Sequence, residues 1–279
     1  MQGDLGAHRR RLFAIAYRML GSTAEAEDVV QDAWLRWQAA TDVKTPEAWL
    51  TTTVTRLCLD RIKSARAQRE VYVGPWLPEP MTTSREEIDP ESISVAFLLL
   101  VERLTPIERA VYLLHRIFDY SHGEIAAMLQ LSDAAVRQSL HRATEHVAAA
   151  RPRFAPDKDR HAALLSAFAM ACQAGDLQTL KSLLAQDAKA YSDGGGKVRA
   201  ALNIVEGCDD VARLFVGLSR KSPAPGLPEL RELNGLPSLI LWQDGRAAMT
   251  ISIETDGVQI FAVHIVLNPD KLAHLHRPD

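Results

Sequence analysis

The sequence contains little cysteine and no long apolar run. Its three cysteines, Cys58, Cys172 and Cys208, are odd in number and lie far apart. This pattern excludes a disulfide framework and a cysteine-based zinc site, and it favours a reducing cytoplasm as the compartment. No segment approaches the roughly 18 consecutive apolar residues that a membrane-spanning helix needs. We therefore expect a cytoplasmic protein with no metal, no cofactor and no membrane partner.

A strong excess of charge of one sign is also missing. The chain has 32 Lys and Arg against 35 Asp and Glu, which gives a formal net charge of -3. A protein that coats nucleic acid would be strongly basic, so any contact with DNA must come from local basic patches. Hydrophobic residues make up 47% and charged residues 24%, which excludes wholesale disorder. With 279 residues, the chain can form two or three domains with separate cores.

Residues 105–151 have the pattern of a helix-turn-helix. Both Thr105-Pro106-Ile107-Glu108 and Ser121-His122-Gly123-Glu124 place a Glu three residues after a hydroxyl side chain, which is the spacing of a capping box at a helix start. A further helix is expected after Ser132. Its apolar side chains recur on one narrow arc, and they are Val136, Leu140, Ala143 and Val147.

The opposite face of this last helix carries side chains suited to the major groove of DNA. Arg can pair with guanine, Gln with adenine, and a small Ala can approach a thymine methyl group. The predicted DNA contacts are Ala134, Arg137, Gln138, His141 and Arg142. Polar arcs on helices are often only solvated surface, which is the alternative interpretation of the same pattern.

A second basic segment lies between Arg56 and Glu70, where five basic residues stand against two acidic ones. Projected on a helix, its apolar residues share one arc and its charged residues the other. The predicted DNA contacts on this second face are Arg56, Asp60, Arg61, Lys63 and Arg66. Two basic helical faces imply two contact points along a duplex.

The stretch 70–92 interrupts the helical pattern with glycine and several prolines and is predicted to be a linker. Helices are expected before it at 8–20, 23–38 and 46–69, and after it from 90 to 150. The linker also contains apolar side chains that a solvated tether would not need. We therefore expect Trp76 and Leu77 to dock on a folded surface.

From Asp157 onward the pattern changes to that of an α+β domain. Helices are expected at 160–174, 176–184 and 209–220, and strands at 239–242, 247–253 and 258–266. The strands are separated by Asp244-Gly245 and Asp256-Gly257, which are typical of hairpin turns.

The first 150 or so residues resemble the extracytoplasmic-function (ECF) sigma factors, the promoter-recognition subunits of bacterial RNA polymerase. Residues 26–35 resemble the acidic helix that binds the polymerase clamp, 49–61 the helix that reads and melts the minus-ten element, and 104–142 the region that reads the minus-thirty-five element. The resemblance implies that core polymerase is bound by Asp28, Gln31, Asp32, Trp34 and Leu35. The alternative is that Trp34, Leu35 and Trp37 are simply core residues. Many members have Asn in place of Arg56 and Gly in place of Gln130.

Three short motifs resemble signatures of the sigma factors that carry a fused C-terminal SnoaL-like domain. They are Trp76-Leu77-Pro78-Glu79-Pro80, Asp193-Gly194-Gly195-Gly196-Lys197 and Asn268-Pro269-Asp270-Lys271-Leu272. In that subgroup the extension is thought to regulate the sigma core in cis, in place of a separate anti-sigma protein. The implied fold is multidomain: two all-α sigma domains, the second with the helix-turn-helix, and then an α+β cone of curved antiparallel sheet with helices over its open side.

This resemblance predicts five segments: a region 2 domain at 1–69, the linker at 70–92, a region 4 domain at 93–151, a short linker at 152–158 and the SnoaL-like regulatory domain at 159–279. The expected partners are core RNA polymerase and promoter DNA, with no catalysis by this chain, and an unknown small ligand of the C-terminal domain is left open as a further partner. One alternative is a DNA-binding regulator fused to a small-molecule-binding or cyclase/isomerase-like domain, with Asp193 or His264 as acid or base. Another is an ordinary repressor or activator that uses only residues 104–150.

Overall fold

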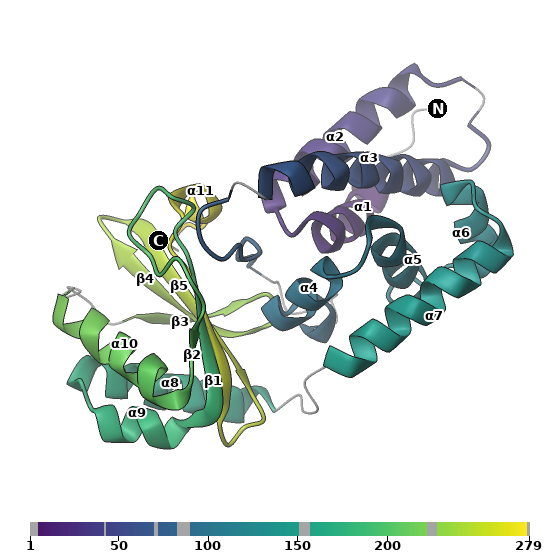
Figure 1. The fold of residues 1–279 in the computed structure, drawn as a ribbon. Helices are drawn as coiled ribbons and strands as arrows, with labels where there is room; N and C mark the ends of the chain where they lie inside the picture. Colours follow the sequence, from purple (N-terminus) through teal and green to yellow (C-terminus); the bar gives the residue numbers. More distant parts are fainter. Residues whose placement is uncertain are drawn as a thin grey trace. The chain divides into compact units, whose positions relative to one another are not determined.

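The computed structural model describes residues 5–41, 43–69, 72–82, 90–150, 157–221 and 228–277 (Figure 1). The chain divides into two compact units. The first comprises Met1–Val71 and Phe97–Arg151, and the second comprises Tyr72–Ala96 and Pro152–Asp279. Tyr72–Ala96, which separates the two helical halves of the first unit along the sequence, therefore belongs to the second unit.

The first half of the helical unit contains α1 (Leu5–Leu20), α2 (Thr23–Ala39) and α3 (Pro46–Arg69). The Ser22 hydroxyl accepts a hydrogen bond from the Glu25 amide and so caps α2. The three helices bury a shared core, which includes Leu12, Ile15, Met19, Val29, Val30, Leu50 and Val54. The predicted bounds of α2 and α3 are confirmed to within one residue.

The second half contains α4 (Val95–Glu102), α5 (Pro106–Arg116), α6 (His122–Leu129) and α7 (Asp133–Ala150). Both predicted capping boxes are present at the starts of α5 and α6. The core of the helix-turn-helix includes Ile125, Met128, Val136 and Leu140. Between α6 and α7, Gln130 adopts the left-handed conformation with φ of 58°. Glycine would enter that region without a steric cost, so Gln130 holds a backbone conformation that is unfavourable for its side chain.

The two halves of the helical unit are joined by buried polar contacts. Arg109, which is 4% exposed, donates to the Val101 and Glu102 carbonyls beside α5 and to the Met19 carbonyl at the end of α1. The hydroxyls of Thr51 on α3 and Tyr120 before α6 lie 3.1 Å apart. A buried guanidinium without acceptors would be costly, so these three carbonyls fix where α5 sits.

The second unit is built on one six-stranded sheet with the order β2-β1-β6-β5-β4-β3. Its elements, in chain order, are a 3-10 turn η1 (Pro90–Ile93), α8 (Lys158–Ala174), α9 (Leu177–Leu183), β1 (Leu184–Asp193), β2 (Val205–Glu206), α10 (Cys208–Lys221), β3 (Glu229–Leu233), β4 (Leu236–Gln243), β5 (Arg246–Thr255), β6 (Ile260–Val266) and α11 (Pro269–Leu272). The hairpin predicted at Asp244-Gly245 is confirmed, and the Asp256-Gly257 turn leads into β6 at Ile260.

The antiparallel meander expected for the three predicted strands is confirmed in β4, β5 and β6, but β1 runs parallel to β6, so the sheet as a whole is mixed. Strand β1 was not predicted at all. It contains Gln186, Asp187 and Lys189, and its buried positions are small residues such as Ala188 and Ala190. The strand has no β-branched residue and a single aromatic one, Tyr191, so it carries few of the residues that mark strands in a sequence.

The two faces of the sheet differ in chemistry. Helices α8, α9 and α10 cover one face (Figure 1), where the rings of Phe168 and Phe215 meet edge to face at 4.8 Å over an apolar core. On the opposite face, side chains of alternating positions along β4, β5 and β6 include Ser238, Thr250 and His264, which line a small cavity together with the linker residues Pro78 and Pro80. This polar face is the one that receives the linker.

Candidate functional site

All five side chains predicted to contact the minus-thirty-five element are exposed on α7: Ala134, Arg137, Gln138, His141 and Arg142. The opposite face of α7 buries Val136 and Leu140 against α6. The helix-turn-helix therefore presents this row outward as the sequence pattern predicts, with Ser132 accepting from the Ala135 amide at the start of α7.

Arg142 differs from the rest of this row because it already has a buried partner. Its Nε donates to Oε1 of Glu108 at 2.7 Å, and Glu108 is 4% exposed. Burial acts to raise the pKa of Glu108, but hydrogen bonds from Arg142 and Thr105 outweigh it and lower the pKa. Arg142 thus ties α7 to the start of α5, a structural contact that its position on the polar arc did not reveal.

The basic face of α3 is less uniform than its sequence suggested. Arg61 lies 3.5 Å from a carboxylate oxygen of Asp28 and 3.3 Å from one of Asp32, and it also donates to the Glu25 carbonyl. A residue predicted to contact DNA is therefore joined to two residues predicted to contact polymerase. Arg61 anchors α3 to α2.

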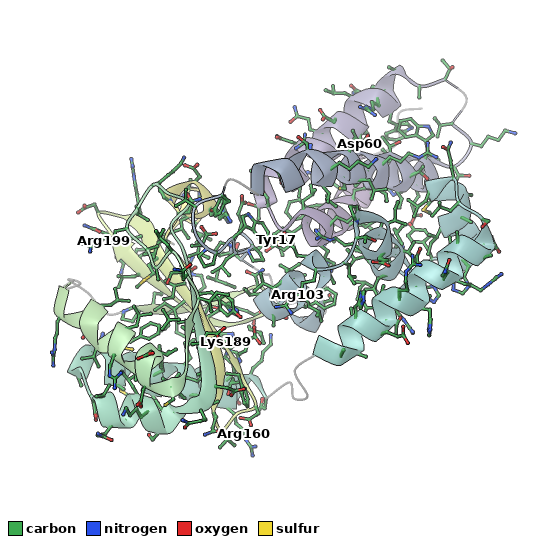
Figure 2. The ribbon with its side chains drawn as sticks, viewed as in Figure 1. Tyr17, Asp60, Arg103, Arg160, Lys189 and Arg199 are labelled. Atoms are coloured by element: carbon green, nitrogen blue, oxygen red, sulfur yellow. The ribbon has the colours of Figure 1, made fainter. Side chains whose placement is uncertain are left out.

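The other charged residues of α3 fall into two groups. Asp60 and Lys63 are strongly exposed and form an ion pair at 3.6 Å (Figure 2 labels Asp60). Arg56 donates through Nε to the carbonyl of Met128 at 3.0 Å, so it contacts the last turn of α6. The side chain of Arg66 lies outside the described residues.

The acidic face of α2 exposes a large apolar side chain. Leu35 is 55% exposed, while Asp28 and Gln31 are also exposed. Trp34 packs edge to face against Trp37, with ring centroids 4.9 Å apart, and neither ring is fully buried. An exposed leucine beside carboxylates is a surface suited to a protein partner.

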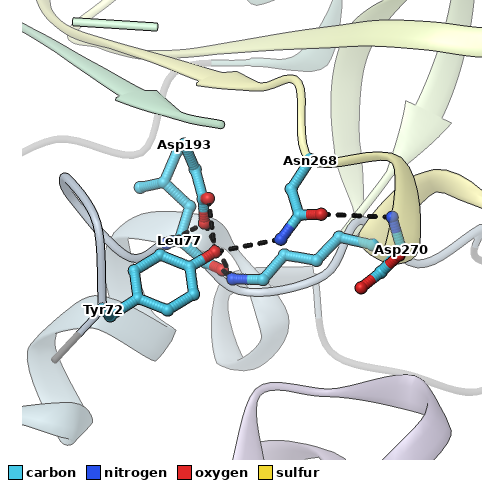
Figure 3. A network of polar contacts seen from close by, with 6 residues as sticks. Tyr72, Leu77, Asp193, Asn268 and Asp270 are labelled. Carbon is cyan, nitrogen blue, oxygen red and sulfur yellow. Dashed lines mark hydrogen bonds and ion pairs between the residues drawn. The ribbon is translucent and has the colours of Figure 1, made fainter. Parts of the chain in front are cut away.

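In the second unit, the three predicted motifs meet at one buried polar cluster (Figure 3). The carboxylate of Asp193 accepts three hydrogen bonds: from the Tyr72 hydroxyl at 2.6 Å, from the Leu77 amide at 2.8 Å and from Nζ of Lys271 at 2.7 Å. Lys271 also donates to the Leu77 carbonyl, and Asn268 donates to the Tyr72 hydroxyl at 3.1 Å. We call these five residues the linker clasp.

The ion pair at the centre of the clasp is buried, whereas Tyr72 is partly exposed. Asp193 is fully buried, and the side chain of Lys271 is 8% exposed. Burial, followed by the hydrogen bond to Asp193, raises the pKa of the Tyr72 phenol above its ordinary value. The Lys271 ammonium also lies over the Trp76 ring, 4.3 Å from its centroid. A buried ion pair of this kind is costly to break from one side, because the remaining charge would be left without a partner.

Each residue of the Asn268-Leu272 motif has a distinct local task. Asn268 caps α11 by accepting from the Asp270 amide, and Pro269 occupies the first helical position. Asp270 forms an ion pair with Lys197, Lys271 enters the clasp, and Leu272 is buried.

The glycine run after β1 is needed because other groups pass close to it. Gly195 has a φ of 58°, and a Cβ at this position would lie 2.2 Å from the amide nitrogen of Asn268 and 3.1 Å from the Tyr72 hydroxyl. Any side chain would therefore collide with the clasp, in addition to the cost of the left-handed backbone.

The parallel pairing of β1 and β6 explains why two distant motifs meet. Asp193 at the end of β1 is in register with Val266 at the end of β6, so the segments that follow both strands emerge at the same sheet edge. The amides of Leu267 and Asn268 both donate to the Asp193 carbonyl. The missed strand is thus what assembles the site.

Two families match the chain in the order of its helices. Sigma-70 region 2 matches residues 5–68, and Sigma-70, region 4 matches residues 94–147. The ECF RNA polymerase sigma factor SigJ of Mycobacterium tuberculosis is 38% identical over 96% of this chain and 92% of SigJ. The chain belongs to the ECF RNA polymerase sigma factors.

The likeness to this sigma factor extends to the whole fold. The crystal structure of SigJ matches with a TM-score of 0.77 at 35% sequence identity, covering 96% of this chain and 97% of that one. The probable ECF sigma factor SigI of Mycobacterium tuberculosis is 29% identical over 95% of this chain and 92% of its own length. The predicted family and fold class, helical sigma domains followed by an α+β domain, are confirmed.

Two contacts between the linker and the C-terminal unit of the present chain were not predicted from its sequence. His274 contacts the Pro80 carbonyl at 2.6 Å through Nε2. The side-chain oxygen of Asn234 accepts a hydrogen bond from the Met81 amide. Asn234-Gly235 is itself a hairpin signal of the same kind as Asp244-Gly245, so attention to this dipeptide would have located the turn.

The two acid-base candidates of the alternative enzymatic interpretation are both buried in this ECF sigma factor. Asp193 is occupied by the clasp, and burial lowers the pKa of His264 to about 4. The described residues contain no group of three or more His, Cys, Asp or Glu arranged to hold a metal ion. Among the described helices, none combines the length and hydropathy needed to cross a membrane.

Proposed function

We propose that this ECF sigma factor directs core RNA polymerase to a specific set of promoters, and that its C-terminal unit regulates it in cis by docking the linker. The observation that carries the regulatory part is the linker clasp. One buried carboxylate, Asp193, holds the side chain of Tyr72 and the backbone of Leu77. A tether that only connected two domains would not need to place a side chain and a backbone amide on a buried carboxylate.

The exposed row on α7 supports the promoter-reading role. Arg137 and Gln138 can reach base edges in the major groove, with Ala134 and His141 beside them on the same face. Arg142 contributes mainly by holding the helix, through Glu108. On α3, Arg56 and Lys63 are the candidates for the minus-ten element, whereas Arg61 is engaged with α2.

The α2 surface supports the polymerase-binding role. Leu35 and the carboxylate of Asp28 face solvent, and Arg61 fixes the helix that carries them. In this proposal, polymerase catalyses RNA synthesis and the sigma factor provides promoter specificity. Its place of action is the cytoplasm, where both partners are found.

The contacts within the helical unit suggest what is regulated. Region 2 and region 4 touch directly, through Arg56 and Met128 and through Thr51 and Tyr120. The two promoter elements are centred about 25 base pairs apart, which is roughly 85 Å of duplex at 3.4 Å per base pair. A closed arrangement cannot span that distance, so the two modules must separate and the linker must extend.

A docked linker opposes that separation. Residues 70–94, which connect α3 to α4, number 25 and reach at most about 80 to 90 Å when fully extended. Every residue held on the sheet is withdrawn from this reach. The C-terminal unit would thereby act as an inhibitor built into the chain, which makes a separate anti-sigma protein unnecessary.

We propose no small ligand for the closed state. The cavity beside His264 and Thr250, with Pro78 and Pro80 on its linker side, leaves about 10 Å³ in which the centre of a water molecule can lie. That volume accommodates about one water molecule.

The test is promoter-specific transcription with purified core polymerase and full-length protein. Tyr72→Phe removes one hydrogen bond to Asp193 and is expected to raise transcript yield at limiting sigma factor. Tyr191→Phe is the control, because it deletes the same hydroxyl from β1, where the ring packs on His264. Absence of promoter-specific initiation with the wild-type chain would refute the sigma role, and equal yields from all three proteins would refute the regulatory role.

A further inference from the structure

The turn between β3 and β4 is unusual because its first residue is buried. Asn234 and Gly235 both have positive φ, of 51° and 74°, as a two-residue hairpin turn requires. Residues at the tips of such turns normally face solvent, as Asp244 does in the next hairpin with the same φ of 51°. Asn234 is 2% exposed.

Asn234 can be buried because its backbone and its side chain together make three hydrogen bonds to the linker. The Asn234 backbone amide donates to the Met81 carbonyl at 2.8 Å, and its Oδ1 accepts from the Met81 amide at 3.0 Å. Its Nδ2 donates to the Ile93 carbonyl at 3.0 Å. Beside it, Thr82 forms an antiparallel bridge with Leu233 on β3, which is the edge strand of the sheet. Met81 and Thr82 therefore pair with the β3 edge of the sheet as the residues of an added strand would.

We infer that the Asn234-Gly235 turn is a second linker-docking site, which gathers both ends of the stretch from Met81 to Ile93 onto one side chain and thereby shortens the tether between region 2 and region 4. This inference rests on the proposed regulatory function. The turn lies at the β3 edge of the sheet, and the linker clasp lies at the ends of β1 and β6. The two sites therefore hold different parts of the linker by different contacts.

The length of chain withdrawn is considerable. Residues 82–92 number 11 and could span about 35 to 40 Å if extended. While Met81 and Ile93 share Asn234, this stretch adds nothing to the distance that the linker can cover. The remaining residues between α3 and α4 number 14, since 25 minus 11 is 14, and reach only about 45 to 50 Å. That is well short of the roughly 85 Å between the promoter elements.

The decisive variant is Asn234→Gly, because glycine keeps the positive φ of the turn and removes only the amide. Asp244→Gly is the matched control, since it makes the same kind of change at an exposed turn with the same φ. Hydrogen exchange of the Met81 amide in the full-length protein is the direct readout. Asn234→Gly should accelerate this exchange at least about tenfold, equivalent to about 1.4 kcal/mol, while Asp244→Gly leaves it unchanged. Amides in β5 and β6 report that the sheet remains folded in both variants.

The result that overturns the inference is Met81 exchange in Asn234→Gly at the wild-type rate. If Tyr72→Phe nevertheless raises transcription, the regulatory function survives and only the second docking site fails. The opposite outcome, faster Met81 exchange with transcription unchanged in Asn234→Gly and in Tyr72→Phe, upholds the docking site and refutes cis regulation. If the second docking site and cis regulation are both correct, Asn234→Gly raises transcript yield and Asp244→Gly does not.

Discussion

Substitution of Gly195 by Ala should open the linker clasp although it removes none of the clasp's hydrogen-bonding groups. The new Cβ would lie 2.2 Å from the Asn268 amide nitrogen, a distance that no pair of non-bonded atoms of this kind tolerates. Asn268 must therefore move, because the glycine lies on backbone that is fixed by the end of β1. Its movement removes the contact with the Tyr72 hydroxyl and weakens the cap on α11.

The magnitude can be built from these parts. A non-glycine residue in the left-handed region costs about 1 to 2 kcal/mol. Loss of the α11 cap costs about 0.5 to 2 kcal/mol, and the lost hydrogen bond to Tyr72 adds about 0.5 to 1.5 kcal/mol. Beyond the backbone cost, the clasp should thus be weakened by about 1 to 3.5 kcal/mol, which corresponds to roughly 5- to 300-fold in its opening equilibrium.

A matched control separates the collision from the backbone cost. Gly175, which ends α8, has a φ of 64°, and a Cβ there would have no neighbour within 4 Å. Gly175→Ala therefore carries the same backbone cost without the collision. The assay is hydrogen exchange of the Leu77 amide, which donates to Asp193 in the clasp. Exchange should accelerate in Gly195→Ala only. Equal rates in the two variants would show that the closed clasp does not require a glycine at position 195.

Three further outcomes are expected in the same protein. The C-terminal unit should lose stability as the pH falls from about 6.5 to about 4, because burial lowers the pKa of both His161 and His264 to about 4 and the unfolded chain takes up protons that the native state refuses. The loss approaches about 3 kcal/mol per histidine and is measured by denaturant unfolding across that range. Gln130→Gly should stabilise the helical unit by about 1 kcal/mol in calorimetry, since it relieves a left-handed residue. Arg137→Ala should relax base preference at one promoter position by about 1 to 3 kcal/mol in binding assays, whereas Arg142→Ala should mainly lower the melting temperature, because its partner carboxylate is buried.

The helical unit could be predicted closely because its signals are local. A capping box, an apolar arc and a turn occupy a few neighbouring residues, so Thr105, Ser121 and Ser132 were enough to place α5, α6 and α7. Partners could not be predicted in the same way. The contacts of Arg142 with Glu108 and of Arg61 with Asp28 join different helices, and no periodicity within one helix reports them.

The second unit shows the same division more sharply. The motifs beginning at Asp193 and Asn268 were identified as a regulatory set through the family resemblance, yet nothing local shows that they meet. They meet because an unpredicted strand, β1, pairs in parallel with the last strand, and parallel pairing over a long separation leaves no mark in either segment. Asn234 was missed although its hairpin dipeptide was visible, because the dipeptide predicts a turn and not what the turn holds.

The two linker-docking sites differ in a way that bears on how the switch would open. The linker clasp buries an ion pair. Removing the linker takes the Tyr72 hydroxyl and the Leu77 amide from Asp193 and the Leu77 carbonyl from Lys271, but the two charges still compensate each other. The Asn234 turn contains no charge, and its amide can exchange the linker backbone for water at little net cost. Release should therefore begin at Asn234, which frees the longer stretch of tether first, and proceed to the clasp. On this argument the exchange rate of the Met81 amide exceeds that of Leu77 in the wild-type protein, and the reverse order would contradict it.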